Sequence, residues 1–112
     1  MSERPDLGAA RAQIEALGNA VAQVSDTYAT HCDIDRDRDW PALKLSEETG
    51  ELIAAYLKST GRGRRAGIDA AALRAALEDE AADVLAMLLI FAREQEIDLV
   101  ATLERKWFRY LI

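Results

Sequence analysis

The sequence KLSEETGELIAAYL, from Lys44 to Leu57, carries an acidic cluster at the edge of an apolar segment. Side chains three and four residues apart are neighbours on the surface of a helix, so a helical reading places Glu47, Glu48 and Glu51 on one face within little more than one turn. The residues that follow Glu51 are mostly aliphatic. The stretch therefore predicts a helix with an apolar face and a group of carboxylates beside it.

A second acidic pair lies in the sequence LEDEAADVLAMLLIFA, from Leu77 to Ala92. Glu80 and Asp83 are again spaced for one face of a helix. The immediate neighbours of Asp83 are alanine, valine and leucine, and burying an unpaired carboxylate among such residues is costly. We therefore expect Asp83 to lie in apolar surroundings and to need a partner.

Length and composition indicate one small helical domain. The chain has 112 residues, half of them hydrophobic, with few aromatic residues and many alanines and leucines. This length suits a single domain over residues 1–112, and this composition is typical of helices. We expect an all-α fold.

Charge and hydropathy indicate which kinds of partner and which cellular compartment to expect. Twenty acidic residues against fourteen basic ones give a net charge of −6, which argues against a binder of nucleic-acid polymers or of anionic membranes. The start, MSERPD, lacks the apolar core of a signal peptide, and the longest apolar run, Val84 to Ala92, is too short to span a bilayer. We expect a cytoplasmic protein, and the single cysteine, Cys32, is consistent with that.

Four helices are predicted, joined by polar connections. Asp39, Asp69 and Asp98 each stand where a side chain can cap a helix N-terminus, and Pro41 suits a first helical turn. The predicted helices run from about Asp6 to about Tyr28, from Trp40 to about Ser59, from after Asp69 to about Gln95, and from Leu99 to the C-terminus. The glycine- and arginine-rich segment Thr60–Gly67 is predicted to be a loop.

The third predicted helix is apolar nearly all round from Val84 onward. A helix of this kind must be covered on all sides, and three other short helices offer little cover. We therefore expect a four-helix bundle-like subunit that dimerises through its helices, with the third helix at or near the interface.

The carboxylates favour a divalent cation. If Glu48, Glu51, Glu80 and Asp83 converge, two like charges about 5 Å apart repel by roughly 3 kcal/mol at an effective dielectric constant near 20. Several such pairs would rival the whole stability of a small domain, so a cation must be present or some groups must be protonated. Oxygen ligands favour Mg²⁺ or Mn²⁺, while a di-iron bundle would usually carry Glu-x-x-His motifs, and the one histidine, His31, lies outside both acidic motifs.

The two-part pattern of Glu47-Glu48-x-x-Glu51 and Glu80-x-x-Asp83, within KLSEETGEL and EDEAADVL, resembles the MazG-like nucleotide pyrophosphohydrolases. That all-α superfamily also holds phosphoribosyl-ATP pyrophosphohydrolase and the dimeric all-α dUTPases. The resemblance covers about Trp40 to Lys106. It implies a helical dimer, or a tetramer made of two dimers, that uses Mg²⁺ to hydrolyse a nucleoside triphosphate to the monophosphate and pyrophosphate.

The resemblance also implies roles for single residues. It makes Glu48, Glu51, Glu80 and Asp83 the metal ligands, and Glu47 either an outer group or the base that orients water. Lys106 matches a lysine that the family often has in its last helix, and with Lys44 it could contact phosphate oxygens. An asparagine found downstream in many members is not evident in the closing KWFRYLI.

Several alternatives stay open. Trp40 either stacks on a nucleobase or packs at the start of its helix. Arg62, Arg64 and Arg65 either reach a triphosphate or form a solvated loop. The preferred function is house-cleaning of ordinary or modified nucleoside triphosphates, and the alternatives are phosphoribosyl-ATP cleavage and a non-catalytic helical interaction or regulatory module.

Overall fold

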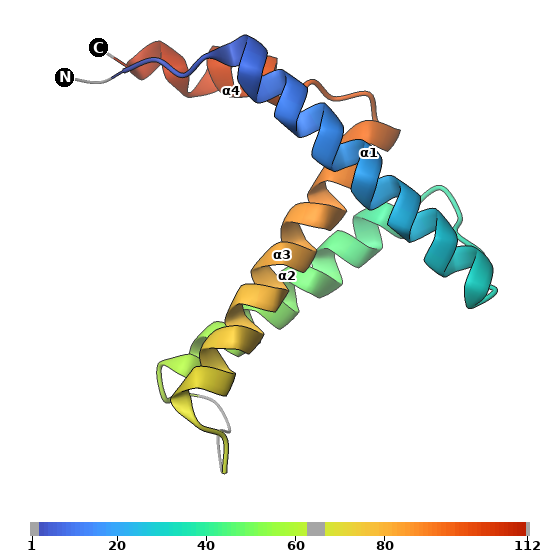
Figure 1. The fold of residues 1–112 in the computed structure, drawn as a ribbon, viewed down its shortest axis with the longest axis vertical. Helices are drawn as coiled ribbons and strands as arrows, with labels where there is room; N and C mark the ends of the chain where they lie inside the picture. Colours follow the sequence, from blue (N-terminus) through green and yellow to red (C-terminus); the bar gives the residue numbers. More distant parts are fainter. Residues whose placement is uncertain (1–2, 63–66, 112) are drawn as a thin grey trace. The chain divides into compact units, whose positions relative to one another are not determined.

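The computed structural model describes residues 3–62 and 67–111. These residues form helices and no β-strand, which confirms the expected all-α class (Figure 1). The elements are α1 (Leu7–His31), α2 (Trp40–Ser59), α3 (Ala70–Glu94), α4 (Leu99–Lys106) and the 3-10 helix η1 (Phe108–Tyr110). Within those two ranges, no helix combines the length and the apolar character needed to cross a lipid bilayer.

The chain divides into two compact units. Unit 1 joins Met1–Asp35 to Leu89–Ile112, and unit 2 is Arg36–Leu88. Unit 1 therefore holds α1, the end of α3, α4 and η1, while unit 2 holds α2 and the larger part of α3. The predicted four-helix bundle-like arrangement stays a prediction.

Two of the three predicted aspartate caps are confirmed. Asp69 Oδ1 accepts a hydrogen bond from the backbone N–H of Ala72 at 2.7 Å, and Asp98 Oδ1 accepts one from Ala101 at 3.0 Å. These bonds satisfy amide groups that have no partner inside the helix. Local sequence thus decides where α3 and α4 begin.

The predicted cap by Asp39 is wrong. Its backbone is already helical, with φ −91° and ψ −8°, and its side chain makes no capping hydrogen bond. A capping residue normally has an extended backbone, as Asp98 does, from which its side chain can reach the N–H of the second or third helical residue. Asp37 acts just before the helix instead, because its Oδ1 accepts from the backbone N–H of Asp39 at 3.0 Å.

Two helices end on a residue with a left-handed backbone that is not glycine. At the end of α1 this residue is Asp33, with φ 54°, and at the end of α3 it is Glu96, with φ 55°. After α3, the N–H of Ile97 donates to the carbonyl of Ala92 at 2.8 Å, and the N–H of Glu96 donates to that of Arg93 at 3.2 Å. This pair of bonds is the Schellman motif, in which glycine is the preferred left-handed residue.

Glu96→Gly is expected to raise the free energy of unfolding by about 1 kcal/mol, because a side chain in the left-handed region meets the backbone and glycine does not. Urea unfolding followed by circular dichroism measures the change. The matched control is Glu94→Gly, at the last residue of α3, which should lower stability through helix propensity. A loss of stability in Glu96→Gly equal to that in the control would contradict this reading of the motif.

The last helix is shorter than predicted. An α-helix from Leu99 to the C-terminus was expected, but α4 ends at Lys106 and is followed by η1. Trp107 leaves the helical path with φ −114°, although its N–H still donates to the carbonyl of Leu103 at 2.8 Å. A 3-10 turn is a common way for a helix terminus to tighten.

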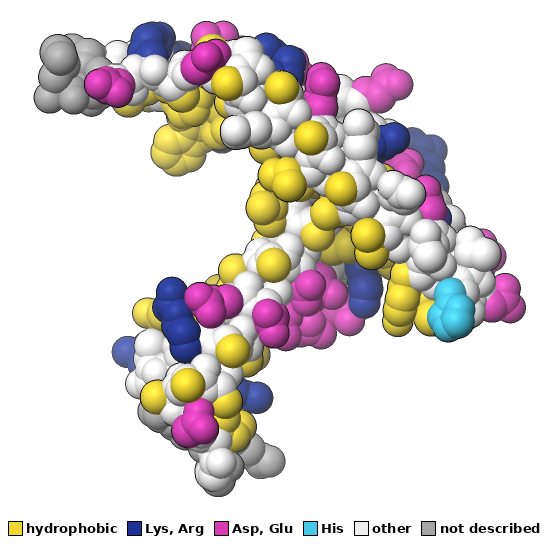
Figure 2. All heavy atoms as spheres, viewed as in Figure 1, with side chains coloured by type: hydrophobic (Ala, Val, Ile, Leu, Met, Phe, Trp, Pro, Cys, Tyr) yellow, Lys and Arg dark blue, Asp and Glu magenta, His cyan; other side chains and the backbone are white. Residues whose placement is uncertain are grey.

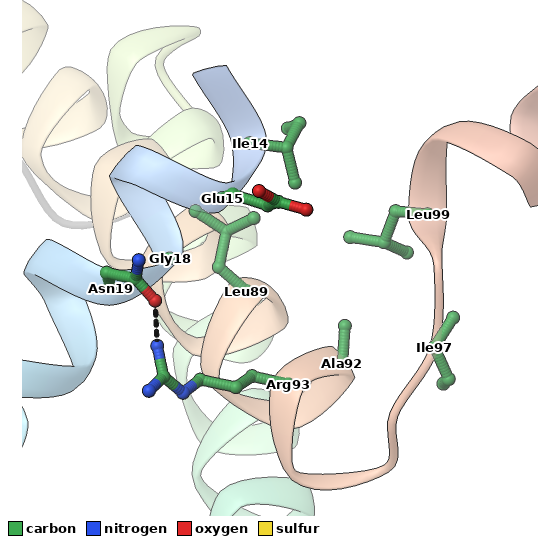
Figure 3. Close-up of a pocket in the computed structure, with 9 residues that line it drawn as sticks. All are labelled: Ile14, Glu15, Gly18, Asn19, Leu89, Ala92, Arg93, Ile97 and Leu99. Carbon is green, nitrogen blue, oxygen red and sulfur yellow. Dashed lines mark hydrogen bonds between the residues drawn. The ribbon is translucent and has the colours of Figure 1, made fainter. Parts of the chain in front are cut away.

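Unit 1 is held by contacts of α1 with α4 and with the end of α3. The guanidinium of Arg11 lies 3.3 Å from Asp98 Oδ2, and this charge, after the backbone hydrogen bond from Ala101, lowers the pKa of Asp98. Arg93 donates a hydrogen bond to Asn19 beside a cavity of about 170 Å³ (Figure 3). Besides those two residues, the cavity is lined mainly by aliphatic ones: Ile14, Leu89, Ala92, Ile97 and Leu99.

In unit 2, α2 and α3 lie antiparallel. Ser59, at the end of α2, lines a common pocket with Ala70, at the start of α3. At the opposite end of the pair, Glu48 of α2 comes close to Asp83 of α3. Leu73 is buried in this unit. The antiparallel pair therefore sets one acidic motif against the other.

Candidate metal centre

The two acidic motifs meet between α2 and α3. One carboxylate oxygen from each of Glu48, Glu80 and Asp83 lies within 4.8 Å of the other two. Acidic side chains gather on α2 and α3 in the space-filling view (Figure 2). The three residues come from helices whose sequences are separated by a loop, so their approach depends on how the helices pair and not on local spacing alone.

Glu48 is the buried member of this group, with 8% of its surface exposed. Its Oε2 is shielded from solvent and has no hydrogen-bond partner, and the same is true of Glu80 Oε2. An acceptor removed from water without a donor loses its hydration and gains nothing in return. Two such oxygens within one small acidic group are suited to binding a positive charge.

Lys44 neutralises only part of the negative charge of this group. Its Nζ lies 3.2 Å from Glu47 Oε1, with which it forms a hydrogen bond, and 3.8 Å from Glu48 Oε1. The hydrogen bond with Glu47 raises the pKa of Lys44, so the ammonium stays charged. Since Lys44 approaches Oε1 of Glu48, the buried Oε2 remains without a positive partner.

The electrostatics of the site show the same deficit of positive charge. Burial raises the pKa of Glu48, and the nearby carboxyl group of Glu51 and the charges of Glu51 and Asp83 act in the same direction. Burial also raises the pKa of Glu80, followed by the charges of Glu51 and Asp83. A carboxylate can donate to its neighbour only after it takes up a proton, which explains why the ionised oxygens have no donor. A proton or a cation would relieve the repulsion.

The donor set fits a hard divalent cation. Oxygens bound to one Mg²⁺ or Ca²⁺ lie at most about 4 to 5 Å apart, since metal–oxygen bonds are about 2.0 to 2.6 Å. The three oxygens here lie within 4.8 Å of one another, which is within that limit for the larger ion. No nitrogen or sulfur ligand belongs to the group, which disfavours zinc.

The other two glutamates of the first motif take different positions. Glu51 is exposed and lies outside the group of three, yet its charge acts on both Glu48 and Glu80. It also lines a pocket together with Glu80. Glu47 is exposed and paired with Lys44, so it lies at the margin of the group. Its position is compatible with an outer role and not with that of a central ligand.

The expected surroundings of Asp83 were wrong. The structure leaves Asp83 exposed, and its neighbours Ala81, Ala82 and Leu85 are exposed as well. The buried carboxylate is Glu48, on the other helix. Apolar neighbours in sequence do not bury a side chain when they point to other sides of the same helix.

Of the predicted substrate-binding residues, Lys44 lies beside the acidic group, and the others have the following surroundings. Trp40 is half-buried at the start of α2, and the guanidinium of Arg36 lies 5.7 Å from the centre of its ring, so a cation already covers one face of the indole. Lys106 is exposed at the end of α4 in unit 1. Arg62 is exposed, and Arg64 and Arg65 lie outside the described residues. Phosphate contacts by these residues stay predictions.

One residue near the site was not among the sequence candidates. Lys58 lines the same pocket as Glu51 and Glu80. Its position seven residues after Glu51 places both on one face of α2. Helical spacing therefore relates Lys58 to Glu51, but the pocket itself also needs residues of α3.

Comparison with other proteins gives no further assignment. The resemblance to MazG-like pyrophosphohydrolases, which is carried mainly by the two acidic motifs, stays a prediction. Searches of the chain against protein-family models, curated proteins and solved structures found no match.

Proposed function

We propose that this chain is a nucleoside triphosphate pyrophosphohydrolase that depends on Mg²⁺ or Mn²⁺. The observation that carries the proposal is the buried Glu48, whose Oε2 has no donor and whose carboxylate faces Glu80 and Asp83 across two helices. A pair of rigid helices holding unpaired carboxylates is a suitable frame for a metal that binds phosphate oxygens. The MazG-like motif pattern supports the same reaction.

In this proposal each side chain has a defined task. Glu48, Glu80 and Asp83 would hold the cation, and Glu51, whose charge acts on Glu48 and Glu80, could join them. The cation would supply a positive charge that gathers phosphate oxygens, lowers the pKa of water and offsets charge that develops at the α-phosphorus. Lys44 keeps Glu47 in place through their 3.2 Å contact. Glu47, which is accessible to solvent, can then accept a hydrogen bond from the attacking water.

The proposal includes a homodimer or a tetramer of two dimers. Large apolar side chains of α2 and α3 are about half exposed in the single chain, including Ile53 (51%), Tyr56 (51%) and Leu85 (48%). Side chains of this kind at a subunit interface would lose unfavourable contact with water. Sedimentation equilibrium at assay concentration should give a multiple of the 12.4 kDa chain mass, and a monomer mass would contradict this part of the proposal.

A non-catalytic helical interaction module is the second candidate, favoured by the same exposed apolar side chains. Asp83 gives no reason to prefer an enzyme, since its side chain is exposed to water. Glu48 provides the reason in its place, because a scaffold gains no stability from a buried oxygen without a donor. Phosphoribosyl-ATP cleavage remains an alternative reaction with no observation of its own.

A screen for pyrophosphate release separates these functions. Purified protein is incubated with ribo- and deoxynucleoside triphosphates and with phosphoribosyl-ATP, in Mg²⁺, in Mn²⁺ or in chelator. We expect equal amounts of monophosphate and pyrophosphate from at least one nucleoside triphosphate, and none in chelator. If only phosphoribosyl-ATP were cleaved, the protein would be a phosphoribosyl-ATP pyrophosphohydrolase instead. If no compound were cleaved, the result would favour the interaction module.

A further inference from the structure

A pocket of about 210 Å³ lies between α2 and α3, directly beside the candidate metal centre. Glu51 and Glu80 line it together with Lys58. Its other lining residues are small or aliphatic, namely Ala54, Ala55, Leu73 and Ala76. The pocket thus joins acidic side chains of the metal centre to a surface of methyl groups and to one ammonium group.

The ammonium group of Lys58 has no partner among residues 3–62 and 67–111, so it can bind a ligand. It forms no ion pair or hydrogen bond with any side chain in the described part of the chain. Lys58 follows Glu51 by seven residues, which is two helical turns or about 10 Å along α2. That separation leaves room between the carboxylates and Lys58 for the sugar and base of a nucleotide.

The lining of the pocket favours a base over a phosphate group. A phosphate group is normally held by several donors, and Lys58 is the only cationic side chain here. Flat apolar surface made by alanine side chains instead suits the face of a ring. The volume is below the roughly 300 to 1,000 Å³ of pockets that enclose whole small molecules, so one portion of a nucleotide fits better than all of it.

We propose, on the basis of the proposed function, that this pocket receives the nucleobase and that Lys58 selects bases with a keto oxygen at C6 of a purine or C4 of a pyrimidine. An ammonium group has three donors and no acceptor. Guanine O6 and the O4 of thymine or uracil are acceptors, whereas adenine N6 and cytosine N4 carry donor hydrogens. Lys58 can therefore donate to the first group and meets a donor in the second. The substrate class is a keto-base nucleoside triphosphate.

The test compares matched nucleotide pairs. The kcat/KM values for dGTP against dATP, and for dUTP against dCTP, are measured in wild type, Lys58→Met and Lys58→Arg. We expect wild type to prefer the keto base in each pair, and Lys58→Met to lower the values for keto bases by roughly tenfold to a hundredfold while the others change little. Lys58→Arg should keep much of the preference, because it retains a charged donor.

Arg74→Met is the control variant. It makes the same charge change on α3, next to Leu73, but Arg74 does not line this pocket. It should leave base preference unchanged. Calorimetric binding of α,β-imido-dGTP and α,β-imido-dATP with Mg²⁺ checks the same preference without turnover.

The outcomes distinguish this inference from the function on which it rests. An equal loss for all four nucleotides in Lys58→Met would assign Lys58 to the phosphates and overturn base selection. If Lys58→Met kept the wild-type preference for keto bases, Lys58 would not contact the base. If wild type cleaves no nucleotide and binds neither analogue, the proposed function fails and this inference fails with it.

Discussion

Glu48→Gln is expected to lower the rate of pyrophosphate release on the order of a hundredfold to a thousandfold. Glutamine has nearly the same shape, so the variant should fold, but it offers a neutral amide where the cation needs a charged oxygen. Glu48 is the most buried of the carboxylates, with 8% exposure, so no other side chain can readily move into its place. The measurement is kcat/KM for the best nucleotide at saturating Mg²⁺.

Glu78→Gln is the matched control for this variant. Glu78 lies on α3 two residues before Glu80, is exposed and pairs with Arg74 at 3.8 Å. It has the same charge as Glu48 but does not belong to the group of three. The control should keep its rate within about twofold, because a surface ion pair contributes little. If both variants released pyrophosphate at the wild-type rate, Glu48 would have no role in the reaction.

The second large effect concerns stability. A divalent cation that binds only the folded protein should raise the free energy of unfolding by about 2.7 kcal/mol at a hundred times its Kd. In a chain of this size that corresponds to a rise in Tm of roughly 10 °C. Thermal unfolding of wild type, measured in chelator and then in Mg²⁺ or Mn²⁺, tests this.

Glu48→Gln should reverse the order of stabilities. In chelator the variant should be more stable than wild type, because it lacks the buried charge whose Oε2 has no donor, and its amide can donate to a neighbouring carboxylate. In excess Mn²⁺, wild type should be the more stable protein. Glu78→Gln should follow wild type in both conditions. If neither cation raised the Tm of the wild-type protein, the proposed metal site would be wrong.

The helices could be predicted largely from local sequence. Asp69 and Asp98 cap their helices as expected, because capping depends on a few consecutive residues. The cap at Asp39 is absent for an equally local reason, since its backbone is already helical and a capping residue needs a non-helical one. Asp33 and Glu96 could not be predicted to adopt a left-handed backbone, because residue type alone favours glycine there.

The sequence predicts which residues form the candidate site, but it does not predict which of them are buried. Helical spacing places Glu80 and Asp83 on one face, and the structure sets that face against Glu48. Which carboxylate loses contact with water depends on the pairing of α2 with α3, which involves residues far apart in sequence. For that reason Asp83 was expected to be buried and Glu48 was found to be.

The same limit explains why Lys58 was missed. A lysine on a helix surface is ordinary in sequence, and only the opposite wall formed by Leu73 and Ala76 makes it part of a pocket. For Trp40, the sequence suggested a role that the structure makes less simple. Its ring was a candidate for stacking on a base, but Arg36, from the connection before α2, already lies over that ring.

Anomalous diffraction from crystals grown with Mn²⁺ tests whether carboxylates of α2 and α3 bind one divalent cation together. We predict an anomalous peak within about 2.5 Å of oxygens from Glu48, Glu80 and Asp83. A peak bound elsewhere, or these three carboxylates turned apart with no ion between them, would contradict it.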